Sequence, residues 1–157
     1  MAIRLTQMQQ ADYELFLSIA TQEYAADKVK NGTWPKEKAL ALSIAAFASL
    51  LPQQWQTKDH YLRKVDCDQE TIGFVWYALQ QEHEQIGGFL YQLYIHPPFR
   101  NNGYGSQVVK LCIEELHALG VDTLALHVFG HNRRALPFYE RLGFQITDYS
   151  LQWNPLS

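Results

Sequence analysis

The chain of 157 residues contains little cysteine, little charge and no long hydrophobic run. Its two cysteines, Cys67 and Cys112, are far apart and form no CxxC pair, which argues against a disulfide scaffold and the common zinc and redox motifs. The longest mostly apolar stretch, residues 39–51, is interrupted by serine and falls short of the about 20 residues that a membrane-spanning helix needs. Internal repeats and Gly/Ser linkers are also absent, so we expect a single domain over residues 1–157 with no membrane span.

Positive charge is scarce as well. Thirteen Lys and Arg residues stand against sixteen Asp and Glu residues, which gives a formal net charge of -3. Nucleic acids and anionic membranes select a basic surface, so neither is expected as a partner, while a small local anion site remains compatible with this balance. The N-terminus shows no signal-peptide pattern, and we therefore expect a cytoplasmic protein whose two thiols are reduced and buried.

Apolar side chains are plentiful: 47% of the residues are hydrophobic and 13% are aromatic, enough for a substantial core. Their spacing follows the helical period in some segments and the strand period in others. After a short N-terminal strand we expect helices over residues 11–30 and 35–51, strands over 61–65, 71–80 and 86–95, a helix over 106–119 and a strand over 123–128. A last helix over 133–142, capped by Asn132, and a terminal strand over 144–153 follow.

This order of elements predicts a mixed α/β (α+β) domain. The three consecutive strands favour antiparallel pairing, whereas the strand–helix–strand unit over residues 86–128 implies one parallel crossover. The result is a mixed, mostly antiparallel central sheet flanked by about four helices. The pair Gly87-Gly88 indicates a bulge or a close backbone approach in the third long strand, and Asn132 is a candidate cap for the last helix.

The most informative segment is Arg100-x-x-Gly103-x-Gly105, which lies between a strand and a helix. Glycines there allow a sharp turn and leave backbone N–H groups unobstructed, and the helix that begins nearby adds a positive dipole end. This pattern indicates a phosphate site, to which Arg100 adds a charge. The alternative is a glycine-rich turn without a ligand. A dinucleotide fingerprint is excluded because the third glycine is missing, and a P-loop because no Gly-Lys-Ser/Thr follows.

Residues 93–105 resemble the acetyl-CoA loop of the GNAT superfamily of N-acetyltransferases, whose signature is Arg/Gln-x-x-Gly-x-Gly/Ala after a hydrophobic strand. Residues 132–144 are similar to that family's second signature, Asn-x-x-Ala-x-x-x-Tyr-x-x-x-Gly-Phe. The two motifs follow one another in the family's order, with one helix and one strand between them. The resemblance implies a single GNAT-like acetyltransferase domain.

The resemblance also implies a function. It predicts transfer of an acetyl group from acetyl-CoA to a primary amine of a small molecule, peptide or protein, by direct attack in a ternary complex. No metal is implied, and the chain would act as a monomer or homodimer. The alternative is an acyl-CoA-binding sensor or interaction module of the same fold without turnover.

Site residues follow from the same resemblance. The two central parallel strands, ending here at Ile95 and Val128, would splay apart to admit the pantetheine arm of the coenzyme. Arg133 and Arg134 would reach the 3′-phosphate or form a solvated face, and Asn132 would contact pantetheine while also capping its helix. The full set of implied cofactor-binding residues is Leu93, Tyr94, Ile95, Arg100, Asn101, Asn102, Gly103, Tyr104, Gly105, Ser106, Asn132 and Arg134.

Catalysis needs a proton donor for the leaving thiolate and a base for the attacking ammonium. The resemblance assigns the donor to Tyr139, for which an aromatic core role is the alternative. Some family members carry a glutamate on the strand before the loop, but residues 86–95 contain no carboxylate. The candidates that remain for the base are a water chain ending at Tyr91 or Gln92, the side chain of His131, and the side chain of Glu23.

An acceptor would enter between the first two helices and the sheet if the family layout holds. Aromatic residues are the candidates for lining that mouth, namely Tyr24, Trp34, Trp76, Tyr91 and Tyr94. No metal site is expected, because His127 and His131 fall on a strand and beyond its end, and so share no helical face.

Overall fold

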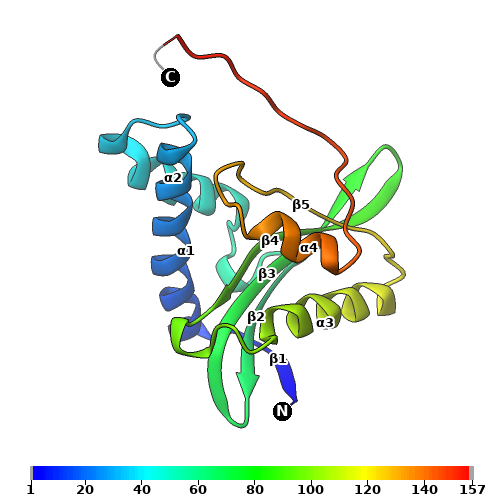
Figure 1. Ribbon diagram of the computed structural model, residues 1–157. Coiled ribbons are helices and arrows are strands. Elements are labelled where there is room, and N and C mark those ends of the chain that lie inside the picture. The colour runs from blue at the N-terminus through cyan, green and yellow to red at the C-terminus, as the bar shows by residue number, and fades with distance from the viewer. Residues whose placement is uncertain (1, 156–157) are drawn as a thin grey trace.

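The computed structural model describes residues 2–155 and arranges them around one central sheet (Figure 1). The strands are β1 (Ile3–Gln7), β2 (His60–Cys67), β3 (Glu70–Glu82), β4 (Gln85–Ile95) and β5 (Leu124–Leu126). The helices are α1 (Gln10–Lys30), α2 (Lys36–Leu50), α3 (Tyr104–Ala118) and α4 (Ala135–Arg141), with 3-10 turns at Gln54–Gln56 and Pro97–Phe99. Within the described part of the chain, no helix is both long and apolar enough to cross a bilayer.

The sheet has the order β1-β2-β3-β4-β5. Neighbouring strands pair antiparallel except β4 and β5, which are parallel because α3 connects them as a crossover. The predicted mixed sheet, mostly antiparallel with one β-α-β crossover, is therefore confirmed.

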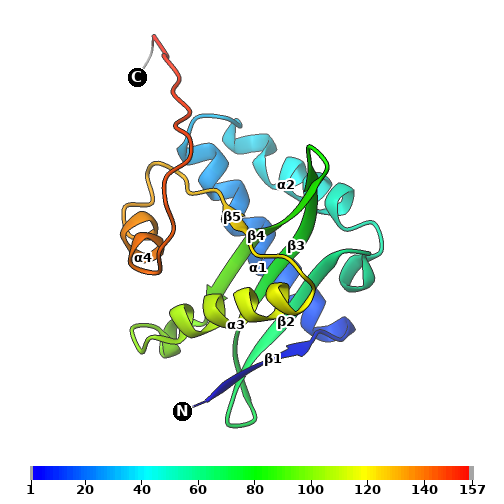
Figure 2. The same ribbon diagram turned by 90° about the vertical axis from the view of Figure 1, so that its right-hand side faces the viewer.

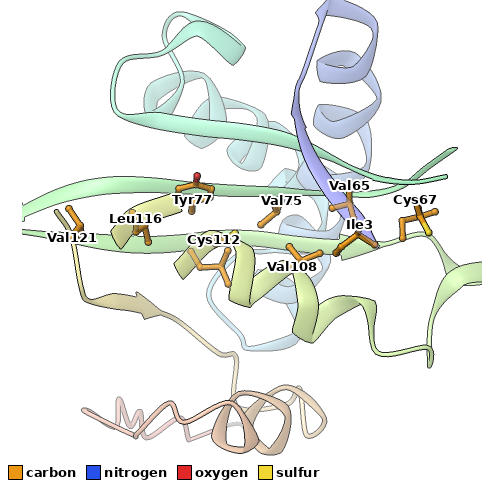
Figure 3. Close-up of a cluster of buried hydrophobic side chains, with 11 residues drawn as sticks. Ile3, Val65, Cys67, Val75, Tyr77, Val108, Cys112, Leu116 and Val121 are labelled. Carbon is orange, nitrogen blue, oxygen red and sulfur yellow. The ribbon is translucent and has the colours of Figure 1, made fainter. Parts of the chain in front are cut away.

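Helix α3 covers one face of the sheet, and α1 and α2 cover the other (Figure 2). The alternation along β3 explains this, because Val75 and Tyr77 point toward α3 while Phe74 and Trp76 point toward α1. Figure 3 shows the α3 side, where Cys112 packs among aliphatic side chains. Both cysteines are buried and free, as expected.

An irregularity in β4 shapes the site. Opposite Trp76 and Tyr77 of β3 stand Gln92 and Leu90 of β4, so the intervening Tyr91 is an extra residue and forms a β-bulge. The bulge is at Tyr91 and not at the Gly87-Gly88 pair, for which a bulge or a close backbone approach was predicted. Gly88 shows instead the close backbone approach, since a Cβ there would lie 3.0 Å from the carbonyl oxygen of Thr123.

The terminal strand predicted over residues 144–153 is wrong. The chain after α4 runs away from the sheet without regular structure (Figure 1), and Tyr149, Leu151 and Trp153 are 78%, 91% and 83% exposed. Alternating apolar residues specify only which face of a strand is buried. A strand also needs a neighbour for its backbone, and this segment has none in the described structure.

The last helix starts later than predicted. Its cap residue is Arg134 and not Asn132, which lies in the preceding turn. Pro137 occupies the third helical position, where its missing N–H costs nothing because the first-turn N–H groups have no acceptor in the helix. The proline therefore fixes the helix start close to itself.

We predict that Gly73→Ala weakens the pairing of β3 with β4. A Cβ at Gly73 would lie 2.1 Å from the carbonyl oxygen of Tyr94, so the strands must separate locally. The free energy of unfolding, measured by urea titration, should fall by about 1–3 kcal/mol, as for other overpacked sites. Gly130→Ala is the matched control, because a Cβ there meets nothing within 4 Å, and it should change stability by less than about 0.5 kcal/mol. Equal stability of both variants would contradict the close approach.

Candidate functional site

A cleft of about 1200 Å³ opens between the second half of β4, the loop before α3, and α4. It is lined by Glu23, Leu93, Tyr94, Ile95, Phe99, Arg100, Asn101, Gly103, Tyr104, Gly105, Ser106, Asn132, Arg133, Arg134, Ala135, Pro137, Phe138, Tyr139, Arg141 and Leu142. The two segments that carry the sequence motifs thus face one another across a single cleft.

The cleft exists because β4 and β5 part. They pair only from Gly88 with Leu124 to Leu90 with Leu126, and the bulge at Tyr91 follows immediately. From Tyr91 to Ile95, β4 therefore has no neighbouring strand on this side in the described structure. Its backbone N–H and C=O groups offer an extended amide-containing ligand the pairing that a further strand would make. The expected splay is present, although β5 ends at Leu126 and not at Val128.

The loop before α3 presents backbone N–H groups. Asn101 and Gly103 both have left-handed backbone conformations, with φ of 65° and 79°. Asn102 does not line the cleft; its side-chain amide donates to the carbonyl oxygens of Phe99 and Arg100, each at 3.1 Å, and braces the turn.

Helix α3 begins at this turn. Its first three N–H groups, on Tyr104, Gly105 and Ser106, have no acceptor within the helix, and the helix dipole adds partial positive charge there. The missing side chain of Gly105 allows α4 to pack close to the start of α3, because a Cβ there would lie 3.3 Å from the Phe138 ring. The loop and the helix end together form a site suited to a phosphate group.

Four arginines add positive charge to the cleft: Arg100, Arg133, Arg134 and Arg141. Arg100 is held against β4, since its Nε donates to the carbonyl oxygen of Ile95 at 2.6 Å and its guanidinium lies 5.1 Å from the centre of the Tyr94 ring. Arg141 was not among the residues predicted from the two sequence motifs. The available signal was its spacing: Arg141 follows Pro137 by four residues and Arg134 by seven, so it lies on the same face of α4.

Tyr139 lies on α4 and packs against the α3-side core. Its ring contacts Phe138 and Phe144 edge-on, at centroid distances of 4.9 and 5.4 Å, so its orientation is fixed. Burial raises the pKa of Tyr139 to about 12, which keeps its hydroxyl protonated at neutral pH. Tyr139 therefore keeps a hydroxyl proton that it can donate, in a hydrogen bond, to a group in the cleft.

The structure does not bring together the residues that were predicted to line the mouth of an acceptor site. Trp76 is only 2% exposed, stacks on Tyr91 at 4.3 Å and donates its indole N–H to His60, so it is a core residue and its predicted place at the mouth is wrong. The Tyr91 hydroxyl accepts a hydrogen bond from Gln80.

Tyr24 and Trp34 contact each other edge-on at 5.5 Å, and Tyr24 also lies 6.1 Å from Phe129, in the segment after β5. They stand beside the cleft and do not line it. Across residues 2–155, no group of three or more His, Cys, Asp or Glu side chains is arranged to hold a metal ion.

A mixed sheet whose two parallel strands part beside a glycine-rich helix N-terminus is the architecture of an acetyltransferase domain. A family model described as the Acetyltransferase (GNAT) family matches residues 21–144, and the chain belongs to this family. The resemblance inferred from the two sequence motifs is thus confirmed.

Relatives agree with this assignment. The chain is 38% identical over 149 residues to an uncharacterized N-acetyltransferase, YycN, of Bacillus subtilis (strain 168), covering 94% of this chain and 96% of that protein. A crystal structure of YycN superposes with a TM-score of 0.93 at 35% identity, over 99% of this chain and 100% of that one. The PaiA N-acetyltransferase of Thermoplasma acidophilum, solved in complex with coenzyme A, shares the fold with a TM-score of 0.71 at 18% identity, over 96% and 94% of the two chains.

Proposed function

We propose that the protein transfers an acetyl group from acetyl-CoA to a primary amine of a small molecule or peptide, by direct attack within a ternary complex. This proposal rests on the observation that two features meet in one cleft. The unpaired edge of β4 suits the amides of a pantetheine arm, and it leads to the N-terminus of α3, which suits a pyrophosphate.

The cleft fits coenzyme A in its charge as well. The chain as a whole is acidic, but four arginines line this cleft. Tyr104, Gly105 and Ser106 also line it, and their N–H groups have no acceptor within α3. Bound acetyl-CoA would supply an activated acyl group as a thioester. The complex of PaiA with coenzyme A supports the same use of the shared fold.

Acyl transfer to an amine develops negative charge on the thioester carbonyl oxygen and then on the leaving sulfur. The bulge frees the backbone N–H groups around Tyr91 from the sheet ladder, and one of them is our candidate donor to the carbonyl oxygen. Tyr139 lines the same cleft with its proton retained, and we assign it the role of donor to the thiolate. A non-catalytic acyl-CoA module would need neither of these groups.

Gly103→Val should abolish coenzyme A binding while leaving the fold intact. Valine is strained at the φ of 79°, so the turn must change and the amides of the following residues lose their alignment. Losing one charge-assisted hydrogen bond of about 1.5 kcal/mol already weakens binding about tenfold, so isothermal titration with coenzyme A should show at least that loss.

Gly120→Val is the matched control for this variant. Gly120 follows α3 at its other end with a φ of 80°, and a Cβ at either glycine meets nothing within 4 Å. Both substitutions should cost similar stability, but only the first should weaken binding. Retained affinity in Gly103→Val would rule out the loop as the phosphate site.

Tyr139→Phe should lower kcat about 100-fold, the typical scale for loss of one acid in general acid catalysis, with little change in the KM for acetyl-CoA. The measurement is thiol release from acetyl-CoA with a panel of amines. Tyr149→Phe removes a hydroxyl from a residue that is 78% exposed and remote from the cleft lining, and should leave kcat unchanged. Coenzyme A binding without thiol release across the panel would favour the non-catalytic alternative.

A further inference from the structure

We propose that Glu23 of α1 is the general base that accepts the proton of the attacking ammonium, an inference that rests on the proposed acetyltransferase function. Strand β4 carries no carboxylate along the cleft, so the base must come from another element. Among the residues that line the cleft, Glu23 is the single carboxylate. Glu23 belongs to α1 and lies 69 positions before Gln92, the β4 residue with which it forms a hydrogen bond.

A hydrogen bond joins Glu23 to β4, the strand that borders the cleft. Gln92 directly follows the bulge at Tyr91 and donates from Nε2 to Oε1 of Glu23 at 3.0 Å. The carboxylate is thus anchored beside the point where β4 and β5 part. Its second oxygen accepts no hydrogen bond from the residues that the structure describes, and it is available to an ammonium.

The other candidates for the base are engaged elsewhere. His131 hydrogen-bonds through Nε2 to Oδ1 of Asp27 at 2.8 Å, and it is not part of the cleft lining. The Tyr91 hydroxyl accepts from Gln80 and also lies outside the lining. Gln92 carries an amide and cannot take a proton. Glu23 is the one group of this set that is both in the cleft and basic.

The electrostatic surroundings suit this role. Partial burial raises the pKa of Glu23 above its ordinary value, and the carboxylate of Asp27 on the same helix adds to that rise. Arg100 and the hydrogen bond from Gln92 act in the opposite direction and favour the charged form. A raised pKa makes a carboxylate a stronger base, and the solvent-exposed side of Glu23 gives the accepted proton a route out.

The proton balance closes with the groups of the cleft. Glu23 takes one proton from the ammonium, and the freed nitrogen lone pair forms the C–N bond to the thioester carbonyl carbon. As the tetrahedral adduct collapses, the C–S bond breaks and its electron pair leaves with sulfur. The thiolate takes a proton from Tyr139, and the second nitrogen proton restores that hydroxyl through water. Net, one proton passes from Glu23 to solvent.

The test compares Glu23→Gln with wild type, using acetyl-CoA and whichever of tyramine, glucosamine, spermidine and Gly-Gly-Gly wild type acetylates fastest. At pH 7, kcat/KM for the amine should fall about 100-fold, while the dissociation constant for coenzyme A stays within twofold. The deficit should shrink as pH rises, because the amine then loses its proton unaided. Glu23→Asp should retain part of the activity, since it keeps a carboxylate.

Two further variants separate a catalytic role from a structural one. Glu14→Gln makes the same change on an exposed turn of α1 outside the cleft and should match wild type. Gln92→Leu removes a hydrogen bond that lowers the pKa of Glu23, so the acidic limb of the kcat/KM profile should move to higher pH.

An active wild type with an equally active Glu23→Gln variant would overturn the role of Glu23 alone. A loss of activity that is equal at every pH would also overturn it, because that is the signature of a structural defect. A wild type that binds coenzyme A but acetylates none of the four amines would overturn the proposed function, and the role of Glu23 with it.

Discussion

The separation of β4 from β5 is the constraint on which the rest of the site depends. Two parallel strands that stay paired would satisfy each other's backbone groups and leave nothing for a ligand. Here the pairing stops after Leu90 and Leu126, and the bulge at Tyr91 follows at once. A bulge bends its strand and increases the local twist. Beyond it, β4 from Tyr91 to Ile95 pairs with no strand on the β5 side in the described structure, and this part of β4 borders the cleft together with α4 and the start of α3. In our proposal, the amides of a pantetheine arm pair with this edge of β4.

Backbone groups and side chains have different roles in the proposed site. In our proposal, binding relies on main-chain groups of β4 and of the α3 N-terminus, which are close in sequence and are positioned by local structure. The proposed chemistry relies on side chains that come from distant elements, namely Tyr139 from α4 and Glu23 from α1. The core holds these elements in place, because aromatic residues of α1 pack on Phe74 and Trp76, and α3 packs on the opposite face of β3.

The sequence predicted those features whose causes are local. The glycine at position 103 marks a left-handed backbone turn, and the Asn132-to-Phe144 motif marks α4 and Tyr139, so most of the cleft lining could be named beforehand. Features that depend on long-range pairing were harder. The alternation over residues 144–153 is typical of a strand, but it does not show that a neighbouring strand is missing. A tryptophan is equally compatible with a buried core and with the mouth of a binding site, so the sequence could not place Trp76. The bond between Glu23 and Gln92 joins α1 to β4, and no spacing in the sequence specifies it.

A crystal structure with coenzyme A bound tests the central claim most directly. The account predicts pantetheine amides paired with the backbone of Leu93 and Ile95, the pyrophosphate on the N–H groups of residues 104–106, and the sulfur within about 3.5 Å of the Tyr139 hydroxyl, with Glu23 facing it across the cleft. A coenzyme bound outside the gap between β4 and β5, or one whose sulfur points away from both Tyr139 and the bulge, would contradict it.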